Sequence, residues 1–243
     1  MLGIAFEGCA CRAAFHVGVA AALVDAKVPF GLTAGASSGS IVATALAAGL
    51  AADLPSLWRS LADRSIVSLP RALHNRSPFD MSHLVSSALR TSLGNGDLRT
   101  APGEVLITAT RLRDLATLVL SSREESDMVN VILGSCFIPV LYGRPVRLRG
   151  TLVVDGGLTD NLPVEALARR GCRQILAVVT SVAGTSNKTP IHRRWRPRAA
   201  GAEVRIVSPR RPLRVRSWDL SSASMNEAID EGWESGRLAT RNL

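Results

Sequence analysis

The sequence lacks any long apolar run and any basic segment near its beginning. No stretch approaches the roughly 20 uninterrupted apolar residues that a membrane-spanning helix needs. An apolar, strand-like run already occupies residues 2–6, which leaves no space for the charged first region of a signal peptide. These absences predict a cytoplasmic protein without a transmembrane helix.

Cysteine is scarce, and the common metal and nucleotide motifs are absent. The four cysteines, Cys9, Cys11, Cys136 and Cys172, do not form a disulfide framework in a chain of 243 residues. Cys9 and Cys11 have no second pair at metal-ligand spacing. The chain also has no Walker A lysine, no H-E-x-x-H and no EF-hand loop. The sequence therefore implies no metal and no other cofactor.

Lysine and aromatic residues are also rare. Only Lys27 and Lys188 are lysines, so arginine supplies nearly all of the positive charge behind a formal net charge of +9. This balance favours an anionic partner, although a basic tract is often only a solvated face. Because aromatic residues make up 4% of the chain, base-stacking surfaces for nucleic acid are not expected. We expect peripheral contact with an anionic membrane. The arginines expected to make it are Arg193, Arg194, Arg196, Arg198, Arg210, Arg211, Arg214 and Arg216.

The length and apolar content suit one sizeable core. With 243 residues and 47% apolar content, we interpret residues 1–243 as a single domain, with a core over about 2–210 and a closing helix over about 221–242. Strand-like and helical patterns alternate, which predicts an α/β fold around a largely parallel sheet. The expected strands are 2–6, 28–34, 105–110, 116–120, 151–154, 174–180 and 203–207, and the expected helices are 12–25, 41–50, 51–62, 81–93, 128–133, 163–170 and 221–242.

The stretch Gly35-Ala36-Ser37-Ser38-Gly39 is the centre of this pattern. An apolar run precedes it and a helical pattern follows it, so a strand, a tight turn and a helix are expected. The G-x-S-x-G form is that of a nucleophile elbow, in which a strained bend exposes the serine and the two glycines let strand and helix pass closely. Ser37 is therefore the candidate nucleophile. The alternative is an ordinary turn in which Ser37 or Ser38 caps the helix.

Two further turns contain candidate functional residues. Small residues follow Phe6, and a helical pattern begins near Arg12; such a helix terminus can bind a phosphate or a developing oxyanion. Farther along, an apolar strand leads to Asp155 and a glycine turn, where a carboxylate can accept a proton. The alternatives are an ordinary loop before a helix and an aspartate that bonds to its own backbone.

Together the three stretches resemble the patatin-like phospholipases, a family of serine acyl hydrolases, over roughly residues 2–180. Residues 35–39 fit the family's G-x-S-x-G element, and Asp155-Gly156-Gly157 fits its D-G-[AG] element, with Asn161-Leu162-Pro163 behind it. Residues 135–139 are similar to the segment that the family has before this aspartate. The resemblance implies a three-layer fold and a Ser-Asp dyad, in which Ser37 attacks an acyl carbonyl and Asp155 accepts its proton.

The first loop departs from the family pattern, G-G-G-x-[RK]-G. This chain has Gly8-Cys9-Ala10-Cys11-Arg12-Ala13 there. The resemblance implies that backbone amides of this loop hold the oxyanion, and it assigns Gly8, Cys9, Ala10 and Arg12 to oxyanion or substrate binding. The added side chains are expected to require negative φ. Beside Arg12, Cys9 and Cys11 are either reactive thiols of lowered pKa or small buried fillers.

None of the four histidines is expected to act in the dyad. His16 lies in the first expected helix, where we interpret it as a packed residue near the site, and His74 and His83 flank a central loop. Only His192 follows Asp155, whereas an α/β-hydrolase would have the order Ser, Asp, His with a later nucleophile.

The resulting hypothesis is a lipid acyl hydrolase of the phospholipase A or lysophospholipase type, acting through an acyl-Ser37 intermediate that water resolves with Asp155 as base. Two alternatives stay open. An acyltransferase or thioesterase would use the same dyad, and a non-catalytic protein would bind an anionic membrane with its oxyanion loop closed. The sequence indicates neither the lipid headgroup nor the acyl position, an activating partner or the oligomeric state.

Overall fold

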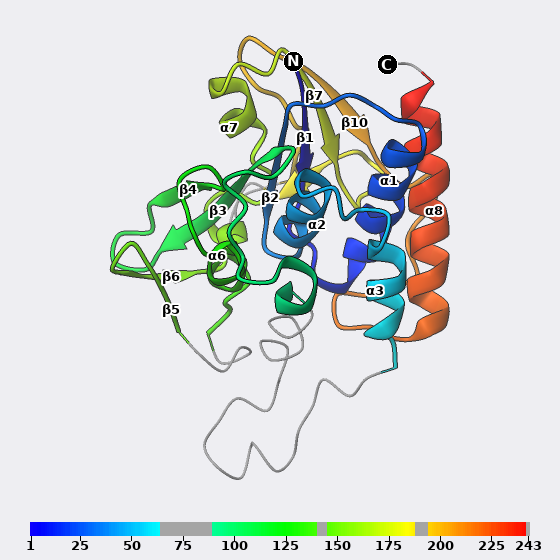
Figure 1. Ribbon diagram of the computed structural model, residues 1–243. Coiled ribbons are helices and arrows are strands. Elements are labelled where there is room, and N and C mark those ends of the chain that lie inside the picture. Colours follow the sequence, from blue (N-terminus) through cyan, green and yellow to red (C-terminus); the bar gives the residue numbers. More distant parts are fainter. Residues whose placement is uncertain (64–88, 140–144, 188–193, 242–243) are drawn as a thin grey trace.

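The computed structural model describes residues 1–63, 89–139, 145–187 and 194–241 (Figure 1). The strands are β1 (Leu2–Phe6), β2 (Leu32–Ala36), β3 (Glu104–Arg111), β4 (Thr117–Ser121), β5 (Val146–Leu148), β6 (Thr151–Val154), β7 (Gln174–Val178), β8 (Ser186–Asn187), β9 (Arg194–Trp195) and β10 (Glu203–Val207). The helices are α1 (Ala13–Asp25), α2 (Ser38–Ala47), α3 (Leu54–Ser60), α6 (Met128–Ser135), α7 (Val164–Arg169) and α8 (Ser222–Thr240), with short 3-10 turns η1 (Ala10–Arg12) and η2 (Gly156–Leu158). No described helix is both long and apolar enough to cross a membrane.

Eight of the described strands form one mixed sheet of order β10-β7-β1-β2-β3-β6-β5, with β4 paired to β3 outside this path. The short strands β8 and β9 pair antiparallel in a separate two-stranded sheet. The strands from β10 to β3 run parallel, whereas β4, β5 and β6 join antiparallel. Side chains alternate between two apolar clusters, as the pleat requires. In β1, Ile4 and Phe6 face the cluster that includes α1, α2, α6 and α8, and Ala5 faces the cluster that includes α7. The α/β fold predicted from the sequence is thereby confirmed.

The sheet register brings the two candidate catalytic residues toward the same level of β3. Ala36 of β2 pairs with Thr108, so Ser37 follows at the level of Ala109. Val154 of β6 pairs with Thr110 and runs in the opposite direction, so Asp155 reaches the same level from the other side. An antiparallel strand thus positions the aspartate.

Several boundaries differ from the prediction. The second strand begins at Leu32 instead of Val28, and the helix expected over 51–62 is shortened to α3, because Pro55 suits the first turn of a helix. Strand β5 was not predicted, since the Arg149-Gly150 turn has positive φ at both residues without the usual Asn-Gly signal. Most of the helix expected over 81–93 lies outside the described residues. The single domain over residues 1–243 stays a prediction.

Helices α1 and α8 approach so closely that glycine is required where they cross. A Cβ atom on Gly18 would lie 2.0 Å from the carbonyl oxygen of Ile229, and one on Gly232 would lie 2.0 Å from that of Phe15. This contact fixes the closing helix beside the first helix of the chain (Figure 1).

We expect Gly232→Ala to lower the free energy of unfolding by about 1–3 kcal/mol, because the added methyl group must push two backbones apart. Asp230→Ala is the control on the exposed face of α8, where a change within about 0.5 kcal/mol is expected. Urea denaturation of both variants measures the difference. Equal stability of the two variants would contradict the close crossing.

Candidate active site

Ser37 occupies a strained backbone conformation between β2 and α2. Its φ of 50° and ψ of −131° lie where residues with a side chain are rare, at a cost of about 1–3 kcal/mol. The Ser37 N–H donates to Ser135 Oγ at 2.8 Å, and the Ser135 hydroxyl donates to Thr108 O at 2.7 Å. The hydroxyl of Ser40 donates to Ser37 O at 2.6 Å. These bonds hold the turn, and the sequence patterns did not identify Ser135 or Ser40 for that task.

The glycines around Ser37 serve close packing and not positive φ. A Cβ atom on Gly35 would lie 2.5 Å from Gly39 O, and one on Gly39 would lie 2.5 Å from Phe6 O. Strand β2, the turn at Ser37 and helix α2 therefore approach one another as closely as the nucleophile-elbow pattern predicts. Gly156 is similarly confined, since its Cβ would lie 2.1 Å from the carbonyl oxygen of Thr108.

Asp155 is held at both ends by hydrogen bonds. Its N–H donates to Phe137 O at 2.8 Å, and its carbonyl accepts from Thr110 Oγ1 at 2.8 Å. Its carboxylate Oδ1 accepts from the Gly157 N–H at 2.7 Å. The side chain thereby has a defined orientation, with Oδ2 left for Ser37.

The Ser37 hydroxyl donates to Asp155 Oδ2 at 2.6 Å. Asp155 is 9% exposed, and burial raises its carboxyl pKa to about 6, although the hydrogen bonds from Ser37 and Gly157 oppose the increase. No histidine of the described residues lies between the two side chains. The arrangement can therefore transfer a proton from a serine hydroxyl directly to a carboxylate that is ionised near neutral pH.

The first loop presents fewer amides than the resemblance implied. The Gly8 N–H donates to Asn161 O at 3.0 Å, the Cys9 N–H to Ser38 Oγ at 3.2 Å and the Cys11 N–H to Ser217 O at 3.1 Å. Among the described residues, none accepts a hydrogen bond from the Ala10 N–H. Of the loop, this amide is the one available to a ligand.

Ala10 corrects the expectation that the substituted loop keeps negative φ. Its φ is 53°, so alanine occupies a left-handed conformation that costs roughly 1–2 kcal/mol. Cys9, with φ −152°, keeps a negative φ. The side chain at position 10 is thus tolerated at some cost, and the loop keeps the turn that a glycine would favour.

Asn161 connects the aspartate turn to the first loop. Its side-chain Nδ2 donates to Gly8 O at 3.0 Å, while its backbone carbonyl accepts from the Gly8 N–H at 3.0 Å. This pair of bonds fixes the first residue of the loop. The resemblance includes Asn161 in a family element, but the sequence alone indicates no structural role for its side chain.

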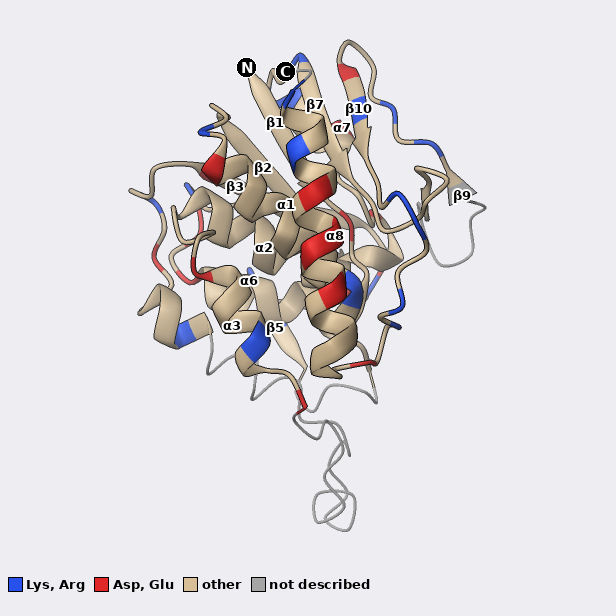
Figure 2. Ribbon diagram, turned by 90° about the vertical axis from the view of Figure 1, so that its right-hand side faces the viewer, with Lys and Arg blue, Asp and Glu red and all other residues tan. Residues whose placement is uncertain are grey.

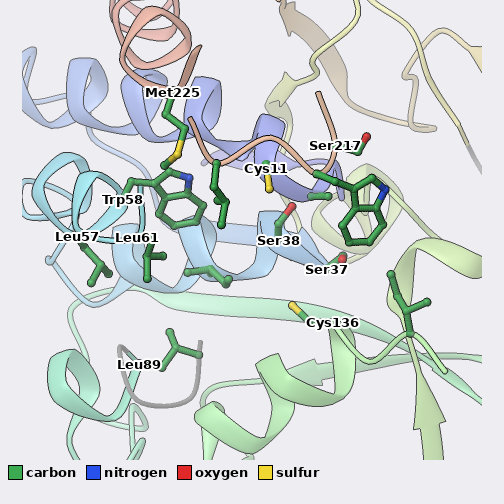
Figure 3. Close-up of a pocket in the computed structure, with 15 residues that line it drawn as sticks. Cys11, Ser37, Ser38, Leu57, Trp58, Leu61, Leu89, Cys136, Ser217 and Met225 are labelled. Atoms are coloured by element: carbon green, nitrogen blue, oxygen red, sulfur yellow. The ribbon is translucent and has the colours of Figure 1, made fainter. Parts of the chain in front are cut away.

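An apolar pocket opens beside Ser37 (Figure 3). Its volume is about 810 Å³, part of which is open solvent, and Ala10, Ser37 and Ser38 are among the residues that line it. Gly8, Cys9 and Arg12 are not among its lining residues. The other side chains around it are Cys11, Ile41, Leu57, Trp58, Leu61, Leu89, Cys136, Ile138, Ser217, Trp218, Leu220 and Met225.

The reactive-thiol alternative for Cys9 and Cys11 is wrong. Both side chains are buried, and burial raises the pKa of the Cys9 thiol and brings that of Cys11 to about 11. The positive charge of Arg12 does not offset the loss of solvent around Cys9. Both residues are packed fillers of the loop.

His16 is packed against the first loop, with its Nδ1 3.8 Å from Cys9 Sγ. It is fully buried, and burial, with a contribution from the charge of Arg12, lowers its pKa to about 3. His74, His83 and His192 lie outside the described residues.

One buried cluster within the described ranges has spacing that could hold a metal. The ligand atoms of Glu7, Cys9 and His16 all lie within 4.8 Å of one another. Glu7 Oε1 already accepts from the backbone N–H of Thr180 at 2.6 Å and from its hydroxyl. The raised thiol pKa of Cys9 further opposes binding, because metals bind the thiolate. We interpret the cluster as support beneath the first loop.

Comparison with known proteins gives one consistent family. A family model described as patatin-like phospholipase matches residues 4–168. The chain is 35% identical over 175 residues to a patatin-like phospholipase domain-containing protein 2 of Bos taurus, covering 68% of this chain and 35% of that protein. It is 30% identical over 172 residues to a 1-acylglycerol-3-phosphate O-acyltransferase of Mus musculus, covering 66% of this chain and 40% of that protein. The chain thus spans well under half the length of these two relatives.

A solved structure supports the fold independently of sequence. VipD from Legionella pneumophila superposes with a TM-score of 0.57 at 13% identity, covering 99% of this chain and 66% of that chain. At this identity, the likeness concerns the fold.

The raised pKa of Asp155 predicts a pH-dependent stability. The folded state binds the Asp155 proton more tightly than a model carboxyl of pKa 3.8, so this contribution is fully present below pH about 4 and is lost as pH rises through about 6. Asp155→Asn removes the buried charge. Relative to wild type, the variant should gain up to about 3 kcal/mol between pH 4 and pH 8, measured by chemical denaturation at each pH. A difference that stays constant over this range would contradict the raised pKa.

Proposed function

The chain belongs to the patatin-like phospholipase family, and from this premise we propose that it hydrolyses carboxylic esters of lipids through an acyl-Ser37 intermediate, with Asp155 as the base. The observation that carries the proposal is the 2.6 Å hydrogen bond from the Ser37 hydroxyl to Asp155 Oδ2. It joins a nucleophile on a strained turn to a base that is ionised above pH about 6.

The formation of the acyl-Ser37 ester and its hydrolysis each need two proton transfers. Ser37 Oγ attacks the acyl carbonyl while its proton passes to Asp155, and the leaving alcohol takes that proton as the ester bond breaks. Water then attacks the acyl-Ser37 ester and gives its proton to Asp155. When the carboxylic acid leaves, the proton returns to Ser37 Oγ. One ester and one water become one acid and one alcohol.

We assign the oxyanion to the Ala10 N–H. This amide has no acceptor among the described residues, and Ala10 lines the pocket beside Ser37. The amides of Gly8, Cys9 and Arg12, the other loop residues assigned to oxyanion or substrate binding, already donate within the protein. A donor fixed in place before the reaction stabilises developing charge without reorganisation. The open Ala10 amide also speaks against a non-catalytic protein with a closed loop.

The apolar pocket suits the acyl chain of the substrate. Its far side is built from Leu57, Trp58, Leu61 and Met225, side chains that are mainly apolar apart from the indole N–H of Trp58 (Figure 3). The mainly apolar lining suits a ligand bound chiefly by apolar contacts. The proposed substrate is therefore a lipid ester of the phospholipase A or lysophospholipase type.

Acyl transfer is the second candidate, and the mouse relative named as an acyltransferase favours it. Transfer and hydrolysis share the acyl-Ser37 intermediate and differ only in whether an alcohol or water resolves it. Thioester hydrolysis would use the same parts. Mass spectrometry of products from phospholipid, triacylglycerol and acyl-thioester mixtures, with and without a lysophospholipid acceptor, separates these reactions.

We expect Ser37→Ala and Asp155→Asn each to reduce hydrolysis about 10³-fold or more, and the double variant to be no worse than the poorer single variant. Wild-type kcat/KM should rise with pH through about 6, as Asp155 ionises. A fluorophosphonate should label wild type and Ser38→Ala at Ser37. Labelling of Ser38 instead, or an active Asp155→Asn, would overturn the dyad.

Asn161 is expected to act as a positioning residue for the oxyanion loop. Asn161→Asp keeps its shape but replaces the donor to Gly8 O with a carboxylate oxygen. The variant should lose about tenfold or more in kcat with little change in KM, since the loop acts in the transition state. Its activity relative to wild type should recover as pH falls, because a protonated aspartate can donate again. A deficit that is the same at every pH would indicate a merely structural role.

A further inference from the structure

Trp218 is exposed at the entrance of the pocket. Its side chain is 50% exposed, although tryptophan is usually largely buried. Of the large apolar side chains that are exposed in the described ranges, Trp218 alone lines the pocket beside Ser37. The exposed indole and the acyl-binding pocket thus form one continuous apolar surface.

Trp218 is presented by a fixed turn. The Asp219 N–H donates to Arg216 O at 3.2 Å, which closes a turn over residues 216–219. Ser217 O accepts from the Cys11 N–H at 3.1 Å, and Val215 just before the turn is buried. The Asp219 carboxylate accepts from the Ser221 N–H at 2.9 Å. The exposure of the indole is therefore imposed by a structured segment.

The charge around this turn is more limited than the sequence predicted. Arg210 and Arg211 pair with Glu231 of α8. Acidic residues of α8 lie beside basic residues of the segment that precedes this helix (Figure 2). Arg214 reaches Glu227 only at 3.6 Å and its side chain is 78% exposed, and Arg216 is exposed as well. Arg193 lies outside the described residues. Positive charge therefore remains beside Trp218 in Arg214 and Arg216.

We propose that the segment of residues 214–218 docks this protein on an anionic lipid bilayer, with Trp218 inserted at the level of the headgroups. Tryptophan prefers this region because its ring is apolar and its N–H is polar. Arg214 and Arg216 would attract the anionic headgroups, and this attraction weakens with salt. Docking there places the pocket entrance against the lipid. The inference rests on the proposed function for its substrate, but the surface can be tested without turnover.

Quenching of tryptophan fluorescence by brominated lipid reports insertion directly. The Ser37→Ala background prevents lipid turnover, and the vesicles contain brominated phosphatidylcholine with phosphatidylglycerol. In this background, we expect the added Trp218→Phe change to remove most of the quenching and Trp233→Phe, the matched control, to keep it. The affinity of Trp218→Ala for the vesicles should fall about tenfold or more, because a half-exposed indole adds substantial apolar area.

A second pair of variants tests the charge. Arg214→Gln should weaken binding to anionic vesicles at low salt, whereas Arg169→Gln, which removes an arginine exposed to 66% on α7, should not. Undiminished quenching in Trp218→Phe, or equal binding of the two arginine variants, would overturn the proposal. Binding of Trp218 to a second copy of the chain, seen as dimerisation that Trp218→Ala abolishes without any vesicle quenching, would also overturn it. If vesicles quench Trp218 but the protein with Ser37 intact hydrolyses no ester, the docking surface stands and the proposed function fails.

Discussion

The strained backbone of Ser37 is the constraint on which the site depends. At φ 50° and ψ −131°, the turn survives only because neighbouring elements determine it from both sides. Ser135 binds its N–H, Ser40 binds its carbonyl, and Gly35 and Gly39 allow strand and helix to pass within contact distance. Ser135 is itself tied to Thr108 of β3, so the central sheet supports the turn directly. The fold thereby stabilises a conformation that the isolated segment would not adopt.

Burial also sets the pKa of Asp155, the proposed base. Removing Asp155 from water raises its carboxyl pKa to about 6, while the Ser37 and Gly157 donors keep it from rising further. A carboxylate with a pKa just below neutral is a stronger base than an exposed aspartate and is still ionised at pH 7. A buried but neutral His16 nearby does not compete for this task. In the proposed mechanism, Ser37 and Asp155 would therefore act as two groups where a triad would use three.

How far the sequence predicts this site depends on whether the chemistry is local. The elbow around Ser37 and the turn after Asp155 are local patterns, and their expected geometry is met by the strands that carry them. The bonds that support them join residues distant in sequence, such as Ser37 with Ser135 and Gly8 with Asn161, and no periodicity reveals such pairs. The alternative of a lowered thiol pKa for Cys9 was wrong for a related reason. A neighbouring arginine is visible in sequence, but the complete burial that outweighs it depends on packing.

The exposed turn and the first loop are parts of one connected structure. Ser217 O accepts the Cys11 N–H, and Cys11 directly follows Ala10, whose amide we assign to the oxyanion. A force on Trp218 from a lipid surface would therefore act one residue away from the oxyanion donor. Under the two proposals, the hydrogen bond from the Cys11 N–H to Ser217 O would connect contact with lipid to alignment of the oxyanion amide.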